Sequence, residues 1–165
     1  MIRVVLFDLG DTLIFEQVDD EQTLDEMVLH LRPDAASVLG DLAGEYKLGL
    51  VTDTERSNEK AVRRALRKLD IEQYFDAVVT SVDVGSRKPR PEMFSVALAA
   101  LNATADEAVM VGNDPHTDIS GAIDLGLTTI LFRPTSYYSE HAAAAAHFVV
   151  DRLSAVPDIV RGLDG

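Results

Sequence analysis

The residue near the start of the chain that is best suited to chemistry is Asp8. It follows an apolar, β-branched run over 2–7, which predicts a buried strand, and a Gly-Asp-Thr turn comes after it. A carboxylate at the end of a buried strand costs desolvation free energy unless a cation or hydrogen bonds compensate it. Open α/β sheets bind ligands at the carboxyl ends of their strands. Asp8 is therefore a candidate nucleophile or metal ligand, and the alternative is an acidic turn that only ends the strand.

Two further predicted strands are also followed by polar residues. The strand expected at 48–52 closes with Thr52, and Asp53 comes directly after it. The loop after the strand expected at 77–81 contains Lys88 between Arg and Pro, so a cation precedes a helix start. Taken alone, a hydroxyl at a strand end can cap the next turn, and a loop lysine can be solvated. At one common sheet edge these residues would instead be able to act on the same ligand.

The strand expected at 108–112 is followed by two carboxylates four residues apart. Asp114 and Asp118 share one face if a helix has begun by Asp114, and each alone could simply complement a helix dipole. A hard-cation site can be built from oxygens of Asp8 and Asp114 with a backbone carbonyl, water and phosphate, as Mg²⁺ prefers. A nucleophile, a metal ion and a charge-spreading cation are the parts of a phosphoryl-transfer site. Their occurrence in order at four strand ends favours this chemistry over the separate alternatives.

Helix-like segments alternate with the strands that position these groups. Helices are expected at 32–44, 58–69, 91–101 and 118–125, with a last one capped by Ser154 that ends near Gly162, and further strands at 128–132 and 148–150. A helical turn is expected at 142–146, and the basic residues of the second helix, Arg63, Arg64, Arg67 and Lys68, are expected on an exposed face. Alternating strands and helices imply right-handed crossovers. We therefore predict an α/β fold, a three-layer Rossmann-like sandwich with a mostly parallel central sheet.

The four groups together resemble the four ordered motifs of the haloacid dehalogenase (HAD) superfamily. The segments that carry the resemblance are 7–13, Thr52, Lys88-Pro89 and 112–118. The resemblance covers essentially the whole chain and implies a Mg²⁺-dependent phosphohydrolase. It assigns these roles: Asp8 as the nucleophile that becomes an aspartyl-phosphate, Thr52 as the phosphate-binding hydroxyl beside Asp53, Lys88 as the charge-stabilising lysine, and Asp114 with Asp118 as the acidic Mg²⁺ motif.

Two positions depart from the family pattern. Family phosphatases usually carry a second aspartate two residues after the nucleophile as general acid and base, whereas this chain has Gly10 there and Asp11 one place later. Gly10 can still offer its backbone carbonyl to the metal, but it cannot protonate a leaving group. General acid–base catalysis typically raises a reaction rate by ~10²–10⁴-fold. We therefore expect slow turnover, or a substrate with a good leaving group such as an acyl or aryl phosphate. Asn113 stands where the family often has an acid and is at best a neutral oxygen ligand, so Asp114 would supply the charge.

The segment 14–31 is short and acidic, and between Thr52 and Lys88 there is room for one helix and one strand. We therefore expect a single domain over 1–165 with a short insert at 14–31 in place of a cap. Dehalogenases of the superfamily close a helical cap over substrate, so dehalogenation is disfavoured. Two alternatives stay open. One is a degenerate HAD-fold binding protein that has lost catalysis, and the other is a receiver-like phosphoacceptor domain, although there the acceptor aspartate follows a middle strand.

The composition limits the classes of partner. The 165 residues carry a formal net charge of -13, which argues against non-specific binding to nucleic acid or to anionic membranes. A bound cation would let an acidic pocket take a small phosphorylated substrate or a phosphoprotein. The chain contains no cysteine, which excludes disulfides and thiolate nucleophiles. It has no apolar run of membrane-spanning length and no signal-peptide pattern, so we expect a cytoplasmic protein of open oligomeric state.

Overall fold

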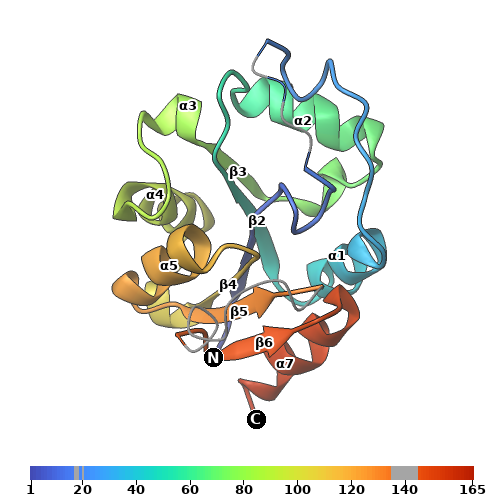
Figure 1. Ribbon diagram of the computed structural model, residues 1–165. Helices are drawn as coiled ribbons and strands as arrows, with labels where there is room; N and C mark the ends of the chain where they lie inside the picture. Colours follow the sequence, from blue (N-terminus) through green and yellow to red (C-terminus); the bar gives the residue numbers. More distant parts are fainter. Residues whose placement is uncertain (17–18, 20, 135–144) are drawn as a thin grey trace.

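A computed structural model describes residues 1–16, 19, 21–134 and 145–165 of the chain. Its centre is a six-stranded sheet in which every neighbouring pair is parallel, in the order β3-β2-β1-β4-β5-β6 (Figure 1). The strands are β1 (Val4–Phe7), β2 (Lys47–Thr52), β3 (Ala77–Thr80), β4 (Ala108–Gly112), β5 (Thr128–Phe132) and β6 (Phe148–Val150). The predicted α/β fold with a parallel central sheet is therefore confirmed.

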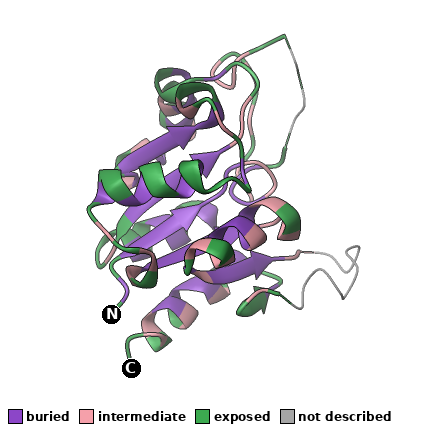
Figure 2. Ribbon diagram, turned by 90° about the vertical axis from the view of Figure 1, so that its left-hand side faces the viewer, coloured by how far each residue is buried: buried purple, intermediate pink, exposed green. Residues whose placement is uncertain are grey.

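Helices cover both faces of the sheet (Figure 1). They are α1 (Ala35–Ala43), α2 (Glu59–Lys68), α3 (Ser81–Val84), α4 (Pro91–Leu101), α5 (Ser120–Leu125) and α7 (Val156–Gly162). Side chains alternate along β1, so Val5 and Phe7 join a core with α1, α2 and α7, while Val4 and Leu6 join a second core with α4 and α5. Both faces of the strand are thus buried, which explains its continuous apolar sequence (Figure 2).

Several predicted boundaries differ from the structure. The first helix begins at Ala35 because Asp34 has a positive φ of 65°. The strand predicted to reach Ser81 ends at Thr80, whose hydroxyl caps the short helix α3, an element absent from the prediction. Ser154 lies inside a 3₁₀ turn over Leu153–Ala155 and does not cap the last helix. The helical turn predicted at 142–146 falls largely outside the described residues.

The described part of the segment 14–31 (residues 14–16, 19 and 21–31), which we call the strap below, is held against α2 and the residues just before that helix. The backbone N–H of Leu24 donates to Ser57 Oγ at 2.9 Å. Arg64 Nε of α2 donates to Asp25 Oδ2 at 2.6 Å, and Lys68 Nζ donates to the Asp25 carbonyl. Arg64 and Lys68, which the sequence predicted only to be exposed, therefore also anchor the strap. The other two basic residues of this face, Arg63 and Arg67, contact Glu72.

No helix within the described ranges is both long enough and apolar enough to cross a lipid bilayer.

Candidate active site

The sheet order brings the predicted residues to one edge. β1 lies between β2 and β4, so Asp8 after β1 is flanked by Thr52 at the end of β2 and by the turn after β4. The Asp8 backbone N–H donates to the Val111 carbonyl at 3.0 Å, which extends the sheet pairing to the carboxylate itself. The chain moves outward from β1 on one side and then returns to β4 on the other. Such a switch point is where open α/β sheets bind ligands.

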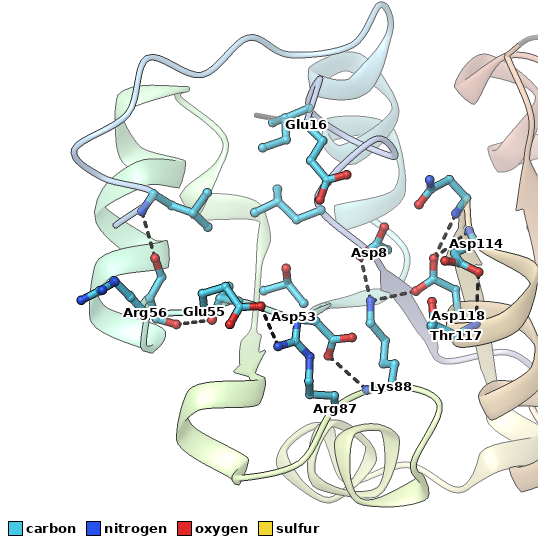
Figure 3. Close-up of a pocket in the computed structure, with 18 of the residues that line it drawn as sticks. Asp8, Glu16, Asp53, Glu55, Arg56, Arg87, Lys88, Asp114, Thr117 and Asp118 are labelled. Carbon is cyan, nitrogen blue, oxygen red and sulfur yellow. Dashed lines mark hydrogen bonds and ion pairs between the residues drawn. The ribbon is translucent and has the colours of Figure 1, made fainter. Parts of the chain in front are cut away.

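Lys88 is the buried cation of the site. Its Nζ donates to Asp8 Oδ1 and to Asp118 Oδ1, both at 2.7 Å (Figure 3). It also donates to the Val51 carbonyl at 2.8 Å. Burial alone would lower the pKa of Lys88, but the two neighbouring carboxylates outweigh burial and raise it. Lys88 is therefore a fixed positive charge, and each of its three ammonium hydrogens is donated to one of these acceptors. The structure thus brings together Asp8 after β1, Lys88 from the loop that follows β3 and α3, and Asp118 from the turn after β4.

Asp53 supports this lysine from the main chain. Its Oδ1 accepts the backbone N–H of Lys88 at 3.0 Å, which fixes the loop from which the ammonium group reaches Asp8. Thr52 is buried and lines the same pocket beside it. The two residues predicted to bind phosphate are thus adjacent to Lys88, one at the pocket wall and one holding the loop.

Asp118 organises the turn after β4. Its Oδ2 accepts the backbone N–H groups of Asn113 and Asp114, both at 3.1 Å, while its Oδ1 accepts from Lys88. Burial and the charge of Asp8 raise the pKa of Asp118 to about 7, against the opposing effect of Lys88. A Cβ at Gly112 would lie 2.4 Å from Asp118 Oδ2, so only glycine fits beneath this carboxylate. Packing against Asp118 therefore requires glycine at position 112.

Asp114 and Asp118 do not share a helix face as their spacing suggested. The turn over Pro115–Ile119 is wider than an α-helix, and α5 begins only at Ser120. The Asp114 carboxylate caps this turn, since its Oδ1 accepts the N–H of His116 at 2.8 Å and of Thr117 at 3.3 Å. Both acids line the pocket, but each is committed to the loop's own backbone.

Asn113, by contrast, reaches Asp8. The end of its side-chain amide lies 2.9 Å from Asp8 Oδ2 and 3.2 Å from the Gly10 carbonyl oxygen. With the nitrogen turned inward, the amide donates to both oxygens. With the oxygen turned inward, three oxygens converge without a hydrogen between them, which is the donor set that a hard divalent cation prefers. The oxygens of Asp8, Gly10 and Asn113 therefore fit a hard divalent cation such as Mg²⁺, while the Asp114 carboxylate, which also lines the pocket, caps the turn that follows it.

This oxygen set contains a single carboxylate. Within the described residues, no three His, Cys, Asp or Glu side chains are grouped so as to hold a metal ion. Thr12 Oγ1 donates to Asp8 Oδ2 at 3.0 Å and so orients the carboxylate beneath Asn113. Thr12 was not among the predicted site residues, and its place four residues after Asp8 was the available signal.

The pocket around Asp8 has a volume of about 380 Å³. It is lined by residues at the carboxyl ends of the strands and by Leu24 and Met27 of the strap. Glu16, which the sequence did not single out, reaches into it from the start of the strap. Partial desolvation of this carboxyl, together with the charges of Asp11 and Asp8, raises the pKa of Glu16 above its ordinary value, although much of the residue is exposed. His116, by comparison, is exposed and lies outside the pocket lining.

Comparison with known proteins identifies the family. A family model described as haloacid dehalogenase-like hydrolase matches residues 14–132. The chain is 35% identical over 159 residues to ribulose-1,5-bisphosphate 5-phosphatase of Halopiger xanaduensis, covering 92% of this chain and 64% of that protein. It is 32% identical over 151 residues to pyrophosphatase PpaX of Bacillus mycoides, covering 91% of this chain and 64% of that protein. The chain belongs to the haloacid dehalogenase-like hydrolases, as its motifs predicted.

A crystal structure of an uncharacterized protein from Listeria monocytogenes serotype 4b superposes with a TM-score of 0.87 at 28% identity, covering 99% of both chains. The likeness therefore extends through the whole fold. This chain nevertheless spans only 64% of the length of each of the two phosphatases above.

Proposed function

We propose that this protein is a Mg²⁺-dependent phosphatase that works through an aspartyl-phosphate on Asp8. The observation that carries the proposal is the Asp8 carboxylate itself. It lies at the floor of an open pocket with one oxygen 2.7 Å from the buried ammonium of Lys88 and the other bound by Thr12. The named relatives are a sugar-bisphosphate phosphatase and a pyrophosphatase, which supports a small phosphorylated substrate.

The chain's own residues can perform both halves of the reaction. An Asp8 oxygen attacks phosphorus, and the bond to the leaving oxygen breaks. Water then attacks phosphorus in the aspartyl-phosphate as the bond from phosphorus to Asp8 breaks, which restores the Asp8 carboxylate; the proton that water loses balances the one that the leaving oxygen gains. The positive charge of Lys88, fixed beside Asp8 by three acceptors, stabilises the negative charge of the phosphoryl oxygens, and the Thr52 hydroxyl donates to one of those oxygens. Mg²⁺ held by Asp8, Gly10 and Asn113 would supply further positive charge against the phosphoryl group.

We further propose that the strap replaces a cap domain. Its anchors on Ser57 and on α2 hold Leu24 and Met27 at the pocket wall, where they would contact the part of the substrate beyond the phosphoryl group. The acids Asp114 and Asp118 then act indirectly, by shaping the loop that presents Asn113.

The test is hydrolysis of para-nitrophenyl phosphate and acetyl phosphate with and without Mg²⁺. We expect metal-dependent turnover in the wild type and none in Asp8→Asn. Asp124→Asn is the matched control because Asp124 is exposed on α5 and lies outside the pocket lining. Turnover that survives Asp8→Asn would refute the aspartyl-phosphate. Wild-type turnover no higher than that of Asp8→Asn would instead favour the catalytically degenerate binding protein.

A further inference from the structure

Hydrolysis of an alkyl phosphate needs a proton at the leaving oxygen and later the removal of a proton from water. Gly10 has no side chain that can do either. The carboxyl groups that line the pocket are therefore the candidates, and most of them are already committed.

Several of these acids already accept hydrogen bonds from other groups of the protein. Asp118 is buried with both oxygens bound, and Asp53 accepts the Lys88 backbone N–H. Asp114 caps the turn that follows it. Glu55 accepts from Arg87 at 2.7 Å, and Asp19 accepts two backbone N–H groups of its own turn. Each of these hydrogen bonds holds the carboxyl group of its acid on a partner within the protein.

Asp11, the nearest acid in sequence to the missing one, is turned away from the pocket. Its φ of 58° places it in the left-handed region, and it is absent from the pocket lining. Its Oδ1 accepts the backbone N–H of Glu16 at 3.0 Å and lies 3.3 Å from Arg32 Nη2. Asp11 therefore fixes the turn that brings Glu16 back over the site.

Glu16 occupies the space that a side chain at position 10 would take. A Cβ built on Gly10 would lie 3.2 Å from Glu16 Oε1, 3.4 Å from its Cδ and 3.5 Å from its Cγ. Figure 3 shows the Glu16 carboxyl directed into the pocket towards Asp8. A glutamate six residues after Gly10 thus delivers a carboxyl to the position that the backbone of Gly10 leaves open.

We propose that Glu16 is the general acid and then the general base of this enzyme, an inference that rests on the proposed phosphatase activity. As the bond from phosphorus to the leaving oxygen breaks, the Glu16 carboxyl gives its proton to that oxygen and becomes a carboxylate. When water attacks phosphorus in the aspartyl-phosphate, the Glu16 carboxylate takes the water proton as the bond to Asp8 breaks. Both residues return to their starting states, and the net reaction is hydrolysis.

The test compares two esters in Glu16→Gln, using kcat/KM because it reports the steps up to formation of the phosphoenzyme. For glycerol phosphate, whose alkoxide is a poor leaving group, we expect kcat/KM to fall by ~10²–10⁴-fold. For para-nitrophenyl phosphate, whose leaving group needs no proton, we expect a loss of less than about tenfold. Glu21→Gln on the same strap, where the residue is exposed and outside the pocket lining, leaves both constants unchanged.

An exchange of the two positions provides a second test. The double variant combines Glu16→Ala with Gly10→Asp, so an aspartate side chain at position 10 enters the space that Glu16 leaves. We expect its kcat/KM for glycerol phosphate to be about tenfold or more above that of Glu16→Ala alone. Equal losses on both esters in Glu16→Gln, or no loss on either, overturn the role of Glu16 and leave the phosphatase intact. A wild type that hydrolyses neither ester overturns both proposals.

Discussion

Gly121→Ala is expected to damage both stability and activity, although the residue contacts no substrate. Gly121 lies in α5 against the loop that carries Lys88 and against α4. A Cβ there would be 2.6 Å from Phe94 Cε2 and 2.6 Å from the Pro89 carbonyl oxygen. These separations are about 0.4 Å inside the closest approach that Cβ atoms normally make, and one of the opposing atoms is backbone.

The size of the effect follows from two opposing terms. Overpacking a buried site costs about 1–3 kcal/mol, and the clash with the Pro89 backbone places this substitution in the upper part of that range, at about 2–3 kcal/mol. Alanine favours a helix over glycine by about 1 kcal/mol, which returns part of that loss. We therefore expect the free energy of unfolding to fall by about 1–2 kcal/mol. Because Pro89 follows Lys88 directly, a shift of its backbone also displaces the ammonium group, and we expect kcat/KM to fall about tenfold.

Urea unfolding followed by far-UV circular dichroism measures the first effect, and hydrolysis of para-nitrophenyl phosphate measures the second. Gly162→Ala is the matched control. It is the same substitution in α7, where an added Cβ meets nothing within 4 Å, so it is expected to stabilise the protein by up to about 1 kcal/mol. If Gly121→Ala were as stable and as active as the wild type, the close packing of α5 on the Lys88 loop would be refuted.

Two more predictions concern the charges of the site. Lys88→Met leaves two buried carboxylates without their cation, so urea unfolding should show a loss of about 3–5 kcal/mol and hydrolysis should cease; an unchanged midpoint would contradict the buried ion pairs. Asn113→Asp places a second carboxylate 2.9 Å from Asp8 Oδ2, so its Tm should fall below the wild-type value in EDTA and rise above it in Mg²⁺. Thermal melts in the two buffers measure this, and equal shifts in both would exclude Asn113 from the cation site.

Much of the local structure follows from sequence pattern alone. The strands are short apolar runs buried on both faces, and their regular alternation with helices allows few arrangements besides a parallel sheet. The boundaries that were missed depend on single backbone angles or caps. Asp34 turns left-handed before α1, and Thr80 caps a four-residue helix with no periodicity to reveal it.

The sequence pattern was enough to predict that Asp8, Thr52, Lys88 and the 112–118 loop share one sheet edge, because the carboxyl ends of parallel strands meet there. The contacts that each neighbouring acid makes became visible only in the folded protein. A wide turn after β4 commits Asp114 to a cap and brings Asn113 to Asp8, while Asp11 directs Glu16 over Gly10. Side-chain direction in such loops is set by non-periodic backbone angles and by distant partners. For that reason, spacing along the chain could not assign these roles.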